Sequence, residues 1–505
     1  AQTISYGLLT ARFSRPAGIS VQNLVDMVPP TNPFLRELLG EFLVVAGRKK
    51  GMFDFDELGI QDVVELLNRA NAEAVKSDFG NRTSNEDPII HFYEHFLAAY
   101  DKKKKIQRGV FFTPQPVVSY IVRSVHELLQ TEFALEDGLA DTTTWGEMAK
   151  RNKGLGIPDG AKPDDPFVLI LDPATGTATF LVEAIDLIHK TLVAKWKAQG
   201  HGEKKIEALW NEYVPKHLLP RLHGYELLMA PYAIAHLKVG LKLDETGYRF
   251  GSDERARIYL TNTLEPASDM AQLKLEGFLP ALAHEAQAVN QVKRQKRFTV
   301  VIGNPPYSGV SSNMTEYAQA LVDAFKMVDG RPLNERKHWL QDDYVKFFRI
   351  SQLALQETGA GVLGVITNHA FLDNPTFRGM RQSLLETFSS GHICDLHGST
   401  KKSDLVPTGI SDENVFDIQQ GVAITIDTKR PGGSRGFRYA HLWGPREDKY
   451  ALLGSSAVGQ MEWSSIRPET PYYFFIPKNL DFLAEYQAGW PITGVMPTYV
   501  NGIVT

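Results

Sequence analysis

Residues 300–307 constrain the fold of this chain more strongly than any other stretch. Three β-branched residues predict a buried strand, and a glycine and two prolines end it abruptly. The prolines leave a stiff loop that carries an amide, Asn304, and an aromatic ring, Tyr307. In an open α/β sheet, ligands bind at the carboxyl ends of the strands. We therefore expect an α/β fold in which this loop holds a planar amino group and stacks on the flat system that carries it.

Composition excludes several classes of protein. A chain of 505 residues is too long for one core, and 43% hydrophobic with 22% charged residues is typical of soluble proteins. A single cysteine, Cys394, excludes a disulfide framework and favours a reducing, cytoplasmic location. We expect no membrane span, because no apolar run is long enough. Since the net charge is −5, binding to DNA depends on basic clusters at residues 102–105, 293–297 and 401–402.

The N-terminal part is expected to be helical. Apolar residues recur at helical spacing over residues 33–46, 60–75 and 88–100, with few strand signals before residue 105. Residues 91–95 match the H-x-x-E-H pattern of a zinc site, but neither a third ligand nor a supporting fold is evident, so we expect no metal. The chain begins at Ala1 and ends without a closing element, which favours a fragment of a longer polypeptide.

The middle of the chain alternates strands with helices, which predicts a doubly wound sheet. Strands are expected at residues 167–171, 222–226, 258–264, 300–302, 361–367, 392–397 and 421–426. Helices are expected at residues 181–193, 201–215, 230–243, 265–297 and 342–357. Residues beyond 430 are interrupted by glycine and proline and are interpreted as a linker and the start of another module.

Two segments have features suited to a ligand. Phe112, Thr113 and Pro114 precede a helix that Thr113 is expected to cap, and a free helix N-terminus favours a carboxylate. The strand at 167–171 leads into Asp172, Pro173, Ala174, Thr175, Gly176 and Thr177, followed by Phe180 in a helix. Strand, glycine-bearing turn and helix are typical of the start of a doubly wound fold.

Two more candidates end the second and third predicted strands. Tyr225 and Glu226 end the second, where a carboxylate can accept hydrogen bonds from ribose hydroxyls. Asn262, Thr263 and Leu264 end the third. No G-x-x-x-x-G-K-[ST] motif is present, which disfavours a nucleotide-hydrolysing motor in this sequence.

The order of these segments resembles the gamma-class DNA adenine-N6 methyltransferases over residues 106–430. The resemblance implies a Rossmann-like, S-adenosylmethionine-dependent methyltransferase sheet between a helical domain (1–105) and a linker with the start of a target-recognition module (431–505). Residues 112–114 would hold the methionine end of the cofactor, the 172–180 segment and residues 225–226 its middle, and residues 262–264 its adenine. Asn304, Pro305, Pro306 and Tyr307 would be catalytic, with Asn304 also near the cofactor. Family members usually carry a glycine where Ala178 stands.

A narrower resemblance concerns residues 373–380 and 412–421, which look like single-chain Type I (ISP-like) restriction-modification enzymes. It implies double-stranded DNA as partner and nuclease and helicase domains in the full-length polypeptide. Phe416 would pack edge-on against an extruded base, although core packing is the competing interpretation. Protein-glutamine and ribosomal-RNA methyltransferases share the tetrapeptide, and a non-catalytic DNA-specificity module is a further alternative. Residues 112–114, placed before the sheet, favour adenine in DNA.

Overall fold

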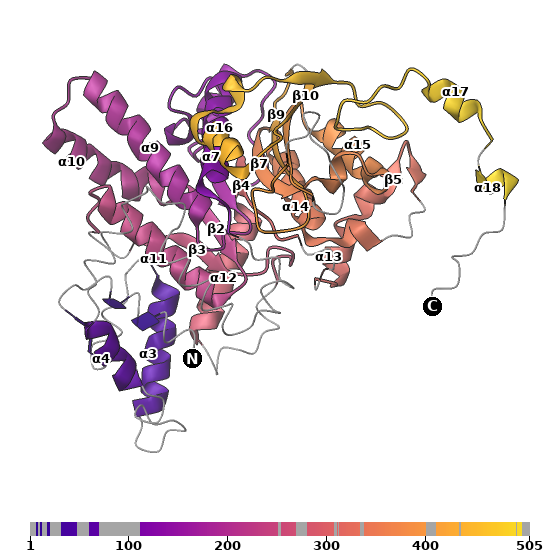
Figure 1. Ribbon diagram of the computed structural model, residues 1–505. Helices are drawn as coiled ribbons and strands as arrows, with labels where there is room; N and C mark the ends of the chain where they lie inside the picture. The colour runs from indigo at the N-terminus through magenta and orange to yellow at the C-terminus, as the bar shows by residue number, and fades with distance from the viewer. Residues whose placement is uncertain are drawn as a thin grey trace.

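The computed structural model describes residues 7–8, 11–12, 18–20, 32–47, 60–69, 112–250, 254–268, 280–307, 311, 313–333, 338–399, 411–433, 436–490 and 492–496. Its centre is a nine-stranded sheet in the order β11-β10-β8-β9-β7-β4-β1-β2-β3 (Figure 1). Strands β9 and β11 run against the others, so the sheet is mostly parallel. The strand order reverses where β1 lies beside β4, which is the switch point at which such sheets bind ligands.

The sheet strands are β1 (Ile170–Asp172), β2 (Leu222–Glu226), β3 (Arg257–Leu260), β4 (Val300–Gly303), β7 (Gly361–Asn368), β8 (Ser390–His397), β9 (Val422–Lys429), β10 (Gly436–His441) and β11 (Ser464–Ile466). A separate ribbon pairs β5 (Met327–Val328) with β6 (Arg331–Pro332). The helices are α3 (Pro33–Gly47), α4 (Ile60–Arg69), α7 (Gln115–Phe133), α8 (Trp145–Arg151), α9 (Thr179–Ala198), α10 (Glu203–Tyr213), α11 (Met229–Glu245), α12 (Pro280–Gln295), α13 (Glu316–Ala320), α14 (Asp343–Thr358), α15 (Arg378–Thr387), α16 (Arg446–Ser455), α17 (Leu483–Ala488) and α18 (Ile492–Val495).

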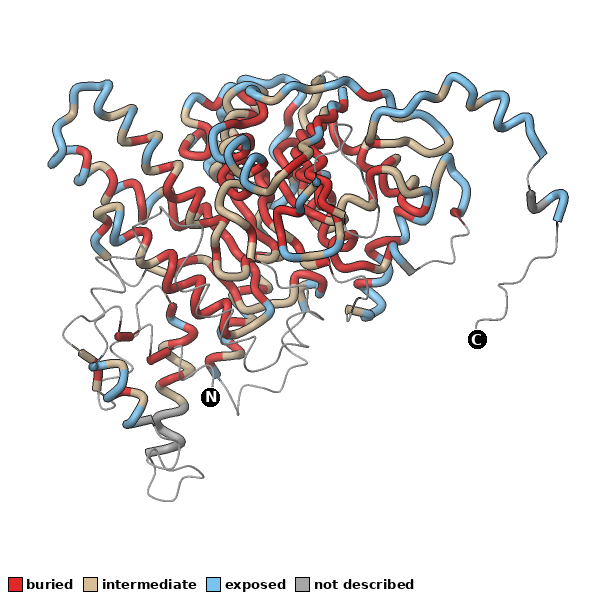
Figure 2. Tube along the Cα trace, in the orientation of Figure 1, coloured by how far each residue is buried: buried red, intermediate tan, exposed pale blue. Residues whose placement is uncertain are grey.

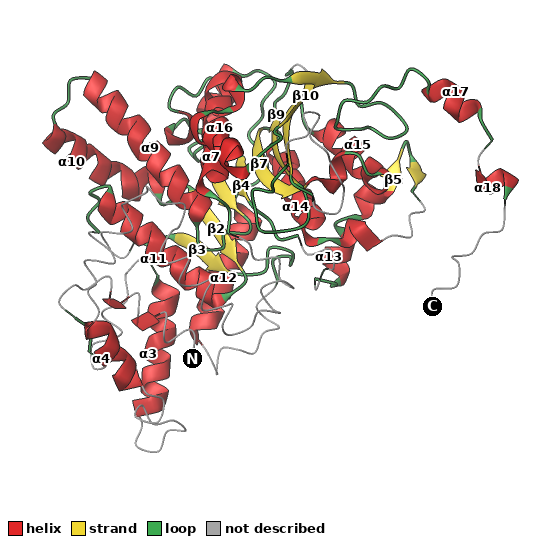
Figure 3. Cartoon of the chain, in the orientation of Figure 1, coloured by secondary structure: helices red, strands yellow, loops and turns green. Residues whose placement is uncertain are grey.

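Helices cover both faces of the sheet. A Cβ at Gly364 would meet Val125 and Ile121 of α7, whereas one at Gly361 would meet Leu355 of α14. Because side chains alternate along a strand, residues 361 and 364 face opposite sides, and so do the two helices. The strands between them are buried (Figure 2), as expected for near-continuous apolar runs in a parallel sheet. The prediction of a doubly wound α/β fold is confirmed (Figure 3).

Two elements differ from their predictions. The strand expected over residues 258–264 ends at Leu260. The side-chain oxygen Oδ1 of Asn262 accepts a hydrogen bond from Leu264 N (3.0 Å), which turns the chain. The helix expected over 265–297 is shorter, since residues 261–268 are not helical and α12 begins at Pro280 among the described residues. Helix α8 was not predicted, although Thr144 and Glu147 form a capping box at its start.

The sheet continues past residue 430. Strands β10 and β11 extend it beyond β8, and α16 packs against α7. Beyond them, α17 and the residue before it carry the large exposed side chains of Tyr486 and Phe482, and α17 lies away from the sheet in Figure 1. Residues 436–466, expected in a linker, are therefore part of the sheet layer, and the division into three domains stays a prediction.

The described part of the N-terminal region is helical. Helix α3 packs on α12, where Glu41 accepts a hydrogen bond from Ala281 N (2.9 Å), and Phe34 lies edge-on to Tyr232. The expected helix at 88–100, the H-x-x-E-H segment and the basic clusters at 102–105 and 401–402 lie outside the described residues. No helix in the described ranges is long and apolar enough to cross a membrane.

Candidate functional site

The loop after β4 lies at the switch point, next to the turn that follows β1. The side-chain nitrogen of Asn304 donates a hydrogen bond to the Thr113 hydroxyl (2.9 Å). The Asn304 carbonyl oxygen is buried and has no hydrogen-bond partner within the part of the chain that the structure describes. Burying an amide oxygen without a partner is unfavourable, so this atom is suited to a ligand that donates a hydrogen bond.

Thr113 does not cap the helix that follows it, contrary to the prediction. Helix α7 begins at Gln115 with Pro114 at the capping position and no side-chain cap. The Thr113 hydroxyl instead holds the Asn304 amide, while the fixed φ of proline starts the helix. Helix α7 is tied to α9, because the Ser119 hydroxyl donates to Glu183 (2.7 Å). The segment predicted to hold a cofactor therefore positions a catalytic candidate directly.

The turn after β1 keeps the shape expected of a glycine-rich loop. Gly176 and Ala178 both adopt left-handed backbone, with φ of 54° and 65°. The alanine thus occupies the conformation that glycine favours, at a cost of roughly 1–2 kcal/mol. One Asp172 oxygen accepts a hydrogen bond from Ala174 N (3.1 Å), and the other is buried with no partner among the described residues.

Glu226, at the end of β2, closes onto the same turn. Its carboxylate accepts hydrogen bonds from Gly176 N (2.9 Å) and Leu228 N (2.7 Å). Burial raises the pKa of Glu226 to about 7 against the effect of these bonds, and burial raises the pKa of Asp172 to about 8. A Cβ at Gly303 would lie 2.8 Å from an Asp172 oxygen, so glycine before Asn304 lets β4 approach the acid. Two buried acids therefore lie where hydroxyl donors would stabilise their ionised forms.

The residues after β3 are already engaged. Thr263 is buried and donates to the Pro173 carbonyl oxygen, which joins this turn to the one after β1. The Asn262 amide donates to Glu265 and Asn313, both at 3.1 Å. Among the other predicted cofactor residues, Leu264, Tyr225, Thr175 and Phe180 are buried and Phe112, Pro114, Ala174 and Thr177 are half-buried. Their cofactor roles stay predictions.

Phe416 lies beside the catalytic loop. Its ring is edge-on to Tyr307, with centroids 6.5 Å apart and planes 73° apart, and each residue is only 4% exposed. Pro305 is buried and Pro306 half-buried, in keeping with a stiff loop. Burial raises the pKa of Tyr307, which keeps the phenol neutral. The structure thus brings the two predicted rings together, and their contact with a base stays a prediction.

Three potential metal ligands lie at the same edge of the sheet. The donor atoms of His369, Asp395 and His397 are within 4.8 Å of one another. Asp395 accepts hydrogen bonds from His369 Nδ1 (3.0 Å), from His397 N (3.0 Å) and from the Tyr439 hydroxyl (3.4 Å). These bonds account for the arrangement without an ion.

The comparisons with known proteins agree with this geometry. Residues 229–401 match the family model described as the Eco57I restriction-modification methylase. Three similar solved structures are the Type ISP restriction-modification enzyme LlaBIII bound to DNA (23% identity, TM-score 0.67), a nuclease-deletion mutant of the Type ISP enzyme LlaGI with a DNA substrate mimic (20%, 0.66) and the DrdV–DNA complex (21%, 0.62). Among the curated proteins, none matches the chain.

The solved structures show which fold the chain has. The three structures cover 95%, 95% and 93% of this chain, which in turn spans 29%, 35% and 40% of theirs. The chain therefore has the fold of these enzymes over nearly its whole length and corresponds to less than half of each. Residues 229–401 alone match the restriction-modification methylase model, and the chain as a whole shares the Rossmann-like fold of these structures.

Proposed function

We propose that this chain is the methyltransferase part of a restriction-modification enzyme and methylates the exocyclic N6 amine of adenine in double-stranded DNA. The observation that carries the proposal is the amide of Asn304. Its nitrogen is committed to Thr113 and its buried carbonyl oxygen has no partner among the described residues. An exocyclic amine donating to that oxygen would satisfy it, and the Pro305 carbonyl oxygen would accept a hydrogen bond from the second N–H of the amine.

The chain's own residues would position the amine and need no strong base. When the two carbonyl oxygens accept hydrogen bonds from both N–H groups of the amine, they draw the nitrogen lone pair out of conjugation. The lone pair is then directed at the methyl donor. Bound S-adenosylmethionine would supply a methyl group on a sulfonium sulfur, which leaves as a thioether. The nitrogen gains positive charge as the new bond forms and releases its proton afterwards, so catalysis comes from positioning and local dipoles.

Two aromatic rings would receive the base outside the duplex. Extruding a base costs a few kcal/mol. Stacking on Tyr307 would offset much of this, since base–aromatic stacking contributes about 1–3 kcal/mol. Phe416 would contact the edge of the same base, because it already lies edge-on to Tyr307.

The buried acids would hold the cofactor. Glu226 would accept hydrogen bonds from the ribose hydroxyls, and the N-terminus of α7 would face the methionine carboxylate. The fit is supported by the Asp172 oxygen that lacks a partner in the described part of the chain. We further propose DNA as partner and nuclease and helicase domains in the same full-length polypeptide, since the chain spans less than half of LlaBIII and LlaGI.

The test is methyl transfer from labelled S-adenosylmethionine to duplex DNA, RNA and protein offered separately. We expect label in DNA alone. Replacing Asn304 by Ala should lower the rate by about 10²- to 10³-fold, as for loss of one transition-state dipole, while cofactor binding measured by calorimetry survives. Asn211→Ala, which removes an amide on α10 that bonds only backbone groups outside the site, is the control. Label in RNA or protein alone would support the alternative amino-methyltransferases, and cofactor binding without transfer would support a non-catalytic module.

A further inference from the structure

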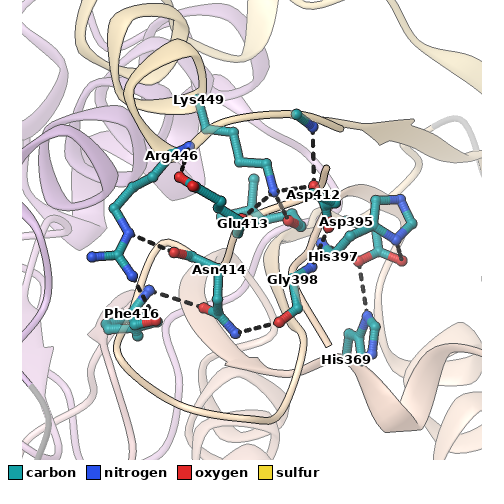
Figure 4. Close-up of polar contacts among 12 residues, drawn as sticks. His369, Asp395, His397, Gly398, Asp412, Glu413, Asn414, Phe416, Arg446 and Lys449 are labelled. Atoms are coloured by element: carbon teal, nitrogen blue, oxygen red, sulfur yellow. Dashed lines mark hydrogen bonds and ion pairs between the residues drawn. The ribbon is translucent and has the colours of Figure 1, made fainter. Parts of the chain in front are cut away.

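Helix α16 holds the loop that carries Phe416. Lys449 of α16 is only 1% exposed, and its ammonium group donates to Asp412 Oδ1 (2.7 Å), Leu396 O (2.8 Å) and Glu413 O (2.6 Å) (Figure 4). All three ammonium protons are therefore used. A buried charge with every proton committed fixes the position of the groups around it.

The partner of Lys449 joins two further segments. Asp412 is also buried, and its carboxylate accepts hydrogen bonds from Gly398 N (2.7 Å) and Gly444 N (3.0 Å). These backbone groups follow β8 and precede α16 respectively. The ion pair consequently fastens the start of the Phe416 loop to both the sheet edge and the helix (Figure 4).

Arg446, one turn earlier on α16, holds the backbone on both sides of the ring. Its guanidinium donates to Asn414 O (2.6 Å) and to Phe416 O (3.1 Å). The Asn414 side chain accepts a hydrogen bond from Phe416 N (2.9 Å), and the Tyr450 hydroxyl donates to Val415 O (2.7 Å). The peptide groups that flank Phe416 are thus bound from both directions.

The far end of α16 is fixed to the helix that begins at the proposed cofactor segment. Arg123 of α7 donates to Leu453 O (2.6 Å) and Ser456 O (2.8 Å), where α16 ends. Cations favour helix C-termini, so Arg123 stabilises this end. Helix α7 starts directly after Thr113, which holds Asn304. The ring of Phe416 and the amide of Asn304 are therefore supported by one packed pair of helices.

We propose that α16 supports the base pocket. Its residues Arg446 and Lys449 are positioning residues that hold Phe416 edge-on to Tyr307 before a base binds. This inference rests on the proposed function. A preformed pocket removes the cost of ordering the loop when the base binds. Displacement of a positioned group by about 1 Å can cost up to about 100-fold in rate.

The test compares two arginines of similar exposure. Arg446 is 32% exposed and supports the loop, whereas Arg430 is 39% exposed and pairs with Glu132 away from it. We expect Arg446→Gln to lower kcat for DNA methylation roughly tenfold, with unchanged affinity for S-adenosylmethionine. Arg430→Gln should leave both unchanged. The substrate is amplified genomic DNA, which carries no prior methylation and needs no known recognition sequence.

A double-mutant cycle separates positioning from general stability. If Arg446 acts through Phe416, Arg446→Gln should change the rate less than twofold in a Phe416→Ala background. The same tenfold loss in both backgrounds, or none in either, overturns the proposal.

Hydrogen exchange gives a readout that does not need activity. Arg446→Gln should speed exchange in residues 411–420 and leave β7 unchanged, and Arg430→Gln should change neither. Unchanged exchange in residues 411–420 overturns the proposed support by α16 even if the wild-type chain is inactive. A wild-type chain that transfers no methyl group to DNA, with exchange altered as expected, means instead that the proposed function has failed.

Discussion

Two pairs of buried carboxylates lie at one edge of the sheet and are treated in opposite ways. Asp172 and Glu226, near the switch point, accept only backbone hydrogen bonds, and an Asp172 oxygen accepts none within the described residues. Asp395 and Asp412, at the β8 side, each have cationic or polar side chains against them. Burial raises the pKa of Asp395, but hydrogen bonding from His369 and the nearby imidazoles outweigh it and leave that pKa low.

This difference in hydrogen bonding indicates which buried carboxylates are suited to bind a ligand. On the β8 side the protein supplies hydrogen-bond partners to Asp395 and Asp412, so these two acids fix a loop and its aromatic ring. Near the switch point it leaves carboxylates poorly solvated, so their pKa values lie at about 7 and 8. Incomplete satisfaction of buried groups is expected where a ligand completes the site. Substitutions at Asp412 and its partner should therefore affect stability, and substitutions at Glu226 should affect ligand binding.

The largest effect is expected at the satisfied pair. Lys449→Met leaves Asp412 buried without its counter-charge and should destabilise the protein by about 3–5 kcal/mol in urea unfolding. The double variant Lys449→Met with Asp412→Asn should recover most of that loss, because no buried charge remains. If the double variant is as unstable as the single one, the pair does not act as a charge pair.

An effect of roughly 3 kcal/mol is expected from the pKa of Glu226, which rises from 4.5 to about 7 on folding. A raised carboxyl pKa means that the folded state binds the proton more tightly. Its contribution is present below about pH 4 and is lost as the pH rises towards 7. The cofactor-free protein should thus become less stable over this range, and Glu226→Gln should lessen the loss while the part due to Asp172, whose pKa is also raised, remains. A wild-type stability that rises from pH 5 to 7, with no difference in the variant, would contradict the assignment.

A smaller effect is expected on binding. Glu226→Gln should weaken S-adenosylmethionine binding by about 10- to 100-fold, since hydrogen bonds to a charged group contribute about 1.5–3 kcal/mol. Glu132→Gln, at a half-exposed acid paired with Arg430, is the control and should bind normally. Equal affinity in the Glu226 variant, measured by calorimetry at pH 8, would show that the ribose lies elsewhere.

The sequence predicted the parts of the fold that depend on local pattern. Residues 222–226 were predicted as a strand, and β2 has the same limits in the structure. For residues 436–466 no strand was predicted, because β10 is short and its place in the sheet depends on pairing with β8. The predicted continuation of β3 beyond Leu260 was wrong, because the side chain of Asn262 turns the chain there.

The site was predictable in its residue types and not in their contacts. Asn304, Tyr307 and Glu226 could be chosen from motifs, and the structure places the rings of Tyr307 and Phe416 edge-on to each other. The hydrogen bond from Asn304 to Thr113 joins residues that are 191 positions apart in the sequence. The contacts of Arg446 depend on helix α16, which no sequence motif predicted. Such long-range contacts carry no local signal, so they emerge only from the folded chain.

The proposal depends on the side-chain oxygen of Asn304, which has no partner among the described residues and would accept a hydrogen bond from the N6 amine of adenine. Its most direct test is nucleoside analysis of duplex DNA after incubation with the protein and S-adenosylmethionine labelled in the methyl group. The account predicts that the label is recovered as N6-methyladenine with the wild-type chain and falls to background with Asn304→Ala. Recovery of the label as a methylated cytosine, or equal labelling by the Asn304 variant, would contradict it.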